Sequence, residues 1–170
     1  LVAIMSMGLG YHRQSEQRLH ERTVDNGAPA PVVTSAGALI QGLQRIGAKK
    51  IAVLTPYMKP LTQLVVDYIE HEGIEVLDAV SLEISDNLQV GAQDPRAPIE
   101  ISRRLATANC DAVVLSACVQ MPSLPSIQPV EDRLGLPVLS AAVCTTHAML
   151  TALNLPAQVP GCGALLSGRY

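Results

Sequence analysis

The chain has 170 residues, of which 48% are apolar and 16% are charged, so it is long enough to bury the core of an ordinary α/β domain. A net charge of −3, four Tyr and no Trp or Phe argue against nucleic acid or an anionic membrane as a partner. The four cysteines form no CxxC pair and have no zinc-ligand spacing, so we expect neither a metal nor a disulfide framework, and we assign the protein to a reducing cytoplasm.

The first 33 residues differ in character from the rest of the chain. Residues 1–5 form an apolar, strand-like run that starts without an initiator methionine and without a preceding turn, so we expect the chain to begin within a fold. The polar stretch at residues 12–26 then separates this run from everything that follows. We therefore assign residues 1–33 to a domain other than the one formed by the rest of the chain.

From residue 34 onward, helical and strand-like patterns alternate. Apolar residues at helical spacing over 34–47, with Thr34 and Ser35 as candidate N-caps, predict a helix. The apolar run at 51–54 predicts a buried parallel strand, and an amphipathic helix at 61–71 and a second strand at 74–79 follow it. A loop rich in Ser, Asp, Asn and Gly spans 81–98 before the next expected helix at 99–108.

The second half of the chain continues this alternation. We expect a third buried strand at 111–116, a helix near 130–135 after two prolines, a fourth strand at 136–140 and a final helix at 145–153, with an irregular tail beyond it. This order predicts an α/β fold with a parallel sheet and right-handed crossovers. Because such sheets bind ligands beyond the carboxyl ends of their strands, functional residues are expected there.

Cys118 is the candidate catalytic residue. It follows the third strand and precedes a turn into a helix, where backbone N–H groups can favour the thiolate. Tyr57 lies at the carboxyl end of the first strand and Asn87 lies in the long loop; both are neutral donors that can bind a carboxylate without placing a cation beside a thiolate. Each of the three is also readily explained by packing or by a surface turn, so the prediction depends on their combination.

The other cysteines are interpreted as packing residues. Cys110 precedes the third strand and therefore lies at the amino edge of the sheet, away from such a site. Cys144 follows the fourth strand and could approach the site, and Cys162 lies in the tail, but packing is favoured for both. Among the four histidines, only His147 is expected near the site.

Five segments carry a family resemblance: 1–5 (LVAIM), 34–39 (TSAGAL), 56–60 (PYMKP), 115–121 (LSACVQM) and 163–168 (GALLSG). In these segments the chain resembles bacterial maleate isomerases, which belong to the aspartate/glutamate racemase superfamily. The resemblance implies two Rossmann-like α/β domains related by a pseudo-twofold axis, each with a parallel four-stranded sheet. Residues 34–143 would form the second domain, residues 1–33 part of the first, and residues 144–170 a C-terminal helix and tail that return to the first domain.

The resemblance also implies an enzyme that converts maleate to fumarate by cis–trans isomerisation without a cofactor. In this family each domain contributes one cysteine; Cys118 matches the second, and the first would stand immediately before Leu1. The first thiolate would add to one alkene carbon, so that the former double bond can rotate. Cys118 would donate a proton to the other alkene carbon and take one back on elimination.

Substrate-binding residues follow from the same resemblance. Tyr57 and Asn87 would bind one carboxylate of the small dicarboxylate substrate and the backbone amides of Leu1 and Val2 the other, with Val119 as a further amide donor. The resemblance favours a homodimer and a role in the breakdown of nicotinate-type aromatics. A related racemase, an arylmalonate-type decarboxylase and a non-catalytic dicarboxylate-binding protein are the alternatives, because a fold does not fix a function.

Overall fold

The computed structural model describes residues 11–27 and 29–170, and its centre is a four-stranded parallel sheet. The strands are β1 (Lys50–Thr55), β2 (Glu75–Ser81), β3 (Ala112–Ser116) and β4 (Val138–Ser140). They lie in the order β2-β1-β3-β4, and every neighbouring pair is parallel. The expected α/β class and the parallel four-stranded sheet are confirmed.

β1 and β3 form the buried middle of the sheet because their residues are almost entirely apolar. Val53 and Leu54 in β1 are fully buried, as are Val113 and Val114 in β3. β2 lies at an edge, and its residues alternate between exposed and partly buried over most of its length. The continuous apolar runs in the sequence therefore mark the two central strands, as expected for strands covered on both faces.

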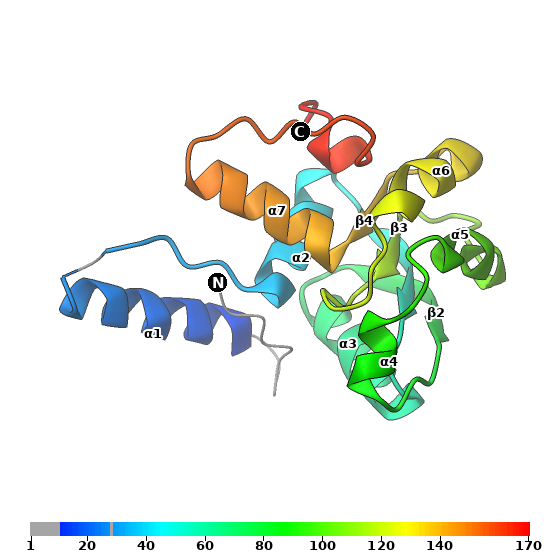
Figure 1. Cartoon of the computed structure of the whole chain (residues 1–170), viewed down its shortest axis with the longest axis horizontal. Helices are drawn as coiled ribbons and strands as arrows, with labels where there is room; N and C mark the ends of the chain where they lie inside the picture. The colour runs from blue at the N-terminus through cyan, green and yellow to red at the C-terminus, as the bar shows by residue number, and fades with distance from the viewer. Residues whose placement is uncertain (1–10, 28) are drawn as a thin grey trace.

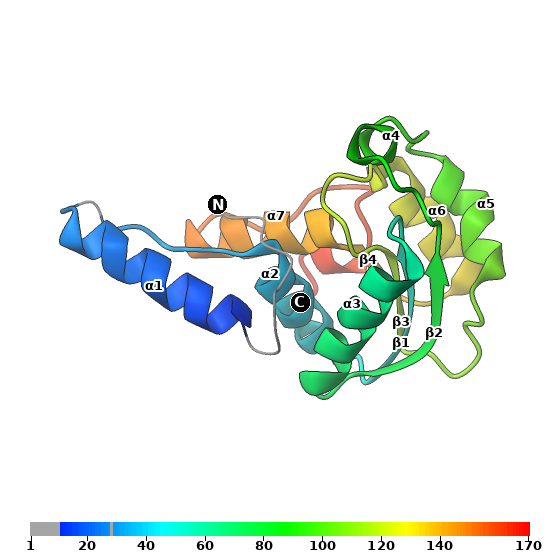
Figure 2. The same ribbon diagram turned by 90° about the horizontal axis from the view of Figure 1, so that it is seen from below.

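Helices cover both faces of this sheet. In both views α2 (Ser35–Arg45) and α3 (Lys59–His71) lie on one side of the sheet, and α5 (Ala97–Ile101) and α6 (Leu124–Leu134) lie on the other (Figure 1 and Figure 2). α7 (Ala141–Ala152) packs along α2. The core lies between these layers and the sheet, which is the usual arrangement of parallel α/β proteins.

Local sequence explains where α2 and α7 begin and how closely they pack. The hydroxyl oxygens of Thr34 and Ser140 each accept a hydrogen bond from the backbone N–H three residues later, at 3.1 and 3.2 Å. Both residues are therefore N-caps that satisfy one of the free donors at a helix start. Gly42 allows close approach of the two helices, because a Cβ at this position would lie 2.6 Å from the Cys144 sulfur.

The long segment at 81–98 was expected to be a loop, but it contains α4 (Asn87–Gly91) and the start of α5. Asp86 is the N-cap of α4, since its carboxylate accepts a hydrogen bond from the Leu88 N–H at 2.8 Å. The helix expected at 99–108 is wrong in its bounds: α5 ends at Ile101 and continues only as the 3-10 turn Ser102–Arg104. These helices are too short to show an apolar period in the sequence.

Two later helices start earlier than expected. α6 begins at Leu124 and not near residue 130. Pro125 is compatible with this start because it lies in the first turn, where the backbone N–H groups have no partner within the helix and proline loses no hydrogen bond. α7 begins at Ala141, directly after β4, and not at residue 145. The tail contains the 3-10 turn Ala164–Leu166 and a bridge between Gln158 and Ser167.

The helix α1 (Tyr11–Asp25) was not expected from the sequence, which is polar around the whole helix. It projects away from the sheet in both views (Figure 1 and Figure 2). The Glu16 carboxylate joins it to the rest of the fold by accepting hydrogen bonds from the Thr34 N–H at 3.0 Å and hydroxyl at 2.7 Å, and Arg13 forms an ion pair with Glu72. Neither α1 nor any other helix in the described part of the chain is long and apolar enough to cross a membrane.

Candidate active site

Cys118 lies just beyond the carboxyl end of β3, in a turn whose backbone is fixed by Ser116. The Ser116 hydroxyl donates a hydrogen bond to the Cys118 carbonyl oxygen at 2.7 Å, and its oxygen accepts one from the Cys118 N–H at 3.2 Å. The Ala117 N–H donates to the Leu54 carbonyl of β1 at 3.2 Å. Cys118 is 8% exposed, so the turn holds a nearly buried thiol at the sheet edge where parallel α/β folds bind ligands.

Tyr57 follows β1, the neighbour of β3, and its phenol lies close enough to Cys118 for the cysteine to affect its titration. Burial raises the pKa of Tyr57 above its ordinary value, and the neighbouring Cys118 raises that pKa further. The phenol therefore remains a protonated donor throughout the neutral range. The Tyr57 backbone is also held, because its carbonyl accepts hydrogen bonds from the Glu83 N–H at 3.1 Å and from the Ser81 hydroxyl. The structure brings Cys118 and Tyr57 together.

Asn87 is the first residue of α4, and α4 lies beside the loop that follows Cys118. Gln120 makes the contact: its side-chain amide donates a hydrogen bond to the Asn87 carbonyl oxygen at 2.5 Å. Val119, between Cys118 and Gln120, is 39% exposed. Val119 is thus the chain neighbour of Cys118, and the Asn87 backbone contacts the same loop through Gln120. The part of both residues in binding stays a prediction. Leu1 and Val2 lie outside the described residues.

Sequence reasoning missed two residues that shape this site. Ser116 had a local signal, since a serine two residues before a strand-end cysteine can bond to the turn backbone. Gln120 had none, because its partner Asn87 is 33 residues away and the contact depends on how the fold brings the two loops together.

The remaining cysteines are buried and free, in agreement with their interpretation as packing residues. Cys110 lies before the amino end of β3. Cys144 packs in α7 against Gly42, and burial raises the pKa of its thiol. Cys162 lies in the tail, where its thiol contacts a backbone carbonyl at 3.7 Å. In the described part of the chain, no group of three or more His, Cys, Asp or Glu residues could hold a metal ion.

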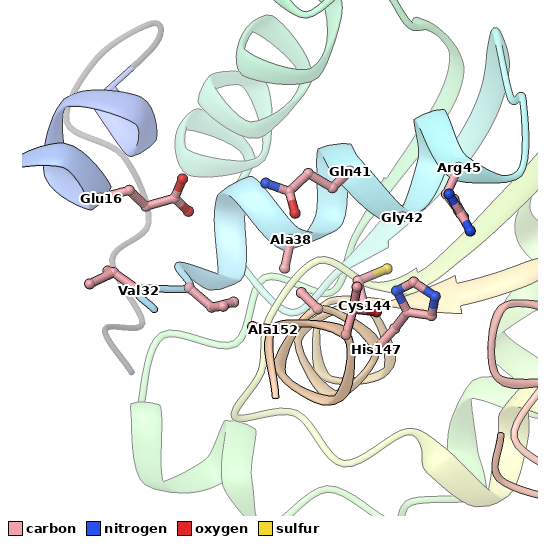
Figure 3. Close-up of a pocket in the computed structure, with 12 residues that line it drawn as sticks. Glu16, Val32, Ala38, Gln41, Gly42, Arg45, Cys144, His147 and Ala152 are labelled. Carbon is pink, nitrogen blue, oxygen red and sulfur yellow. The ribbon is translucent and has the colours of Figure 1, made fainter. Parts of the chain in front are cut away.

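A groove of about 380 Å³ lies between α2 and α7 (Figure 3). Its polar side chains include those of Glu16, Gln41, Arg45 and His147. Cys118 and Tyr57 are not among its lining residues. Burial lowers the pKa of His147, and the charge of Arg45 lowers it further. His147 was expected near the active site, but its side chain lies in this groove between the two helices.

Similar proteins were found by sequence and by structure. A family model described as arylmalonate decarboxylase matches residues 1–166. The maleate isomerase of Geobacillus stearothermophilus is 62% identical over the whole of this chain, which spans 68% of that protein. The crystal structure of a cysteine-to-alanine variant of the maleate isomerase from Pseudomonas putida S16 with maleate has a TM-score of 0.95 at 61% identity, and the match covers 98% of this chain and 67% of that chain.

A third relative is a cysteine-to-serine variant of Nocardia farcinica maleate cis–trans isomerase, solved with a covalently bound succinylcysteine intermediate. It has a TM-score of 0.92 at 41% identity, and the match covers 96% of this chain and 66% of that chain. The chain thus spans about two thirds of the length of these relatives. Since the similarity extends over nearly all of its residues in both sequence and fold, the chain belongs to the maleate isomerase family.

Proposed function

We propose that the protein catalyses the cofactor-independent cis–trans isomerisation of maleate to fumarate. The observation that carries this proposal is that Tyr57 and Cys118 lie next to each other at the carboxyl edge of the sheet, after the neighbouring strands β1 and β3. The 62% identity to a maleate isomerase supports it. A thiol beside a neutral phenol suits a reaction that moves a proton close to a substrate with two negative charges.

The double bond of maleate must become single before the molecule can rotate. A cysteine thiolate adds to one alkene carbon and forms a C–S bond, while the π electron pair moves to the other carbon, which takes a proton from the Cys118 thiol. After rotation the Cys118 thiolate removes a proton from that carbon. The double bond forms again, the C–S bond breaks with its electron pair leaving on the first cysteine, and fumarate is released.

The Nocardia farcinica structure supports this sequence of steps. It contains a succinylcysteine in a variant in which one cysteine has been replaced by serine, so a different cysteine carries the succinyl group. We infer that two cysteines share the chemistry in the present protein as well. Cys118 is then the acid and base, and the nucleophile is expected directly before Leu1.

Neutral donors are proposed to bind the two carboxylates. Tyr57 and Asn87 would bind one, the backbone amides of Leu1 and Val2 the other, and the Val119 amide would add a further donor. Fixed dipoles of this kind can stabilise the enolate-like charge that develops on a carboxylate after addition, and this lowers the energy of the transition state more than that of bound maleate.

Proton NMR tests the proposal directly, because the alkene protons of maleate and fumarate give separate signals. The purified full-length protein is expected to convert maleate to fumarate with no added cofactor. The arylmalonate decarboxylase family model makes decarboxylation the second candidate, and an arylmalonate should then lose carbon dioxide. Decarboxylation without fumarate formation would replace the first proposal with the second.

We also propose that residues 34–143 form the second domain, that residues 1–33 belong to the first, and that residues 144–170 return to the first domain. The projection of α1 away from the sheet supports the separation at residue 33. The boundary after residue 143 falls within the first turn of α7. By family resemblance we infer a cytoplasmic homodimer that serves the breakdown of nicotinate-type aromatics; light scattering of the purified protein tests the dimer.

A further inference from the structure

The helix α4 lies between two loop segments, and each of them is hydrogen-bonded to the rest of the fold. On the side before α4, the Ile84 N–H donates a hydrogen bond to the Pro56 carbonyl at 2.9 Å, next to Tyr57. On the side after α4, the Ser126 hydroxyl donates to the Pro95 carbonyl at 2.7 Å, which joins the loop to α6. Both hydrogen bonds lie several residues away from α4, so they fix the two ends of the segment. The position of α4 between these ends is therefore determined by other contacts.

The body of α4 has one buried anchor and a largely exposed surface. Val90 is 3% exposed, whereas Leu88 is 81% exposed. A helix of this length is not stable by itself in water. The position of Asn87, the first residue of α4, therefore depends on the few contacts that α4 makes with its neighbours.

Gln120 makes such a contact from the loop that carries Cys118. Its side-chain amide donates a hydrogen bond to the Asn87 carbonyl at 2.5 Å, and a Cβ on Gly91 would lie 3.6 Å from the same nitrogen. The side chain thus lies against both the first and the last residue of α4. Because Ser116 fixes the backbone of Cys118, Gln120 links α4 to a rigid turn.

We propose that Gln120 is a positioning residue for the isomerisation. It holds α4, and with it Asn87, at a fixed distance from Cys118. At this distance Asn87 can bind one substrate carboxylate while Cys118 transfers a proton to the alkene carbon. This role rests on the proposed function and requires no contact between Gln120 and the substrate. Loss of the link weakens the hold on the carboxylate and leaves the proton transfer at Cys118 in place, so KM changes more than kcat.

The test compares Gln120→Ala with a matched control, Gln93→Ala. Gln93 also donates a side-chain hydrogen bond to a backbone carbonyl, that of Gln89 at 3.0 Å, but this bond stays within the α4 segment and does not reach the Cys118 loop. In the full-length protein, Gln120→Ala is expected to raise KM for maleate roughly threefold to tenfold with kcat changed less than about twofold, which corresponds to the loss of one neutral hydrogen bond. Gln93→Ala should leave both constants unchanged.

A second variant separates hydrogen bonding from simple packing. Gln120→Glu keeps the size of the side chain but replaces the donor NH₂ with an acceptor oxygen, so it is expected to raise KM at least as much as Gln120→Ala. Hydrogen exchange at residues 87–91 should be faster in both Gln120 variants than in the Gln93→Ala control. Wild-type KM in Gln120→Glu would show that only volume is needed at this position and would overturn the role.

A double-mutant cycle with Asn87→Ala tests whether Gln120 acts through Asn87. If it does, Gln120→Ala adds no further rise in KM once Asn87 has been replaced. Additive effects of the two substitutions on KM would refute the role of Gln120 but not the proposed function. The same would follow if the wild-type protein were active and Gln120→Ala changed KM no more than Gln93→Ala does. A wild-type protein that forms no fumarate would refute the proposed function and the role of Gln120 with it.

Discussion

Replacing Gly163 with alanine is expected to destabilise the fold by about 4 kcal/mol. Gly163 has φ +82° and ψ 177°, a combination essentially restricted to glycine, and other residues there cost about 1–3 kcal/mol. A Cβ would also lie 2.6 Å from the buried Ile127 side chain and 3.1 Å from the Val138 carbonyl. Forcing an extra methyl group into such a packed region costs a further ~1–3 kcal/mol.

Gly161 provides a matched control two residues earlier in the same tail. It also has a positive φ, +74°, but a Cβ there would meet nothing within 4 Å. Gly161→Ala should therefore cost only the backbone strain, about 1–2 kcal/mol. Urea denaturation followed by circular dichroism measures both free energies of unfolding. Equal losses in the two variants would refute the argument, because the close contact with Ile127 would then contribute nothing.

Two further predictions concern Tyr57 and Asp111. Tyr57→Phe keeps the ring but removes the phenol donor that we propose binds a substrate carboxylate. Steady-state kinetics should therefore show kcat/KM lowered roughly 10-fold to 100-fold, the effect of one hydrogen bond to a charged group. An unchanged kcat/KM would show that Tyr57 does not bind the substrate. The Asp111 carboxylate accepts hydrogen bonds from the N–H groups of Lys49 and Lys50, both at 2.8 Å, and these lower its pKa. Its stabilising effect is therefore present above the ordinary carboxyl pKa of about 4 and is lost as the pH falls through the lowered value. Urea denaturation should show that Asp111→Asn has a smaller free energy of unfolding than the wild type at pH 7 and that this difference shrinks in acid. A difference that grew in acid would contradict the predicted direction of the pH dependence.

The sheet could be predicted from the sequence because its signals are local. The apolar runs at 51–54 and 111–116 correspond to β1 and β3, which are buried on both faces. Since parallel strands place their carboxyl ends at one edge, the approach of Tyr57 to Cys118 could be predicted from topology alone. The positions of Cys110 and Cys118 at opposite ends of β3 could also be predicted, because their places relative to the strand are set by the sequence.

The elements that were missed depend on contacts distant in sequence. α1 has no apolar face, and Glu16 and Arg13 attach it through polar contacts with residues 18 and 59 positions away. α4 is too short for a periodic signal, so Asn87 could be assigned to a loop but not placed. Gln120 could not be found because its partner lies on α4.

The most direct test of the central claim is the rate of fumarate formation from maleate, followed by proton NMR, in the wild-type protein, Cys118→Ser and Cys110→Ser. Cys110 is a buried thiol at the opposite edge of the sheet and serves as the matched control. The wild-type and Cys110→Ser proteins should form fumarate at similar rates, and Cys118→Ser should be slower by roughly 100-fold or more, the loss expected for a general acid and base. Equal rates in all three proteins would show that Cys118 does not carry the proton transfer, and an absence of fumarate from the wild type would contradict the account as a whole.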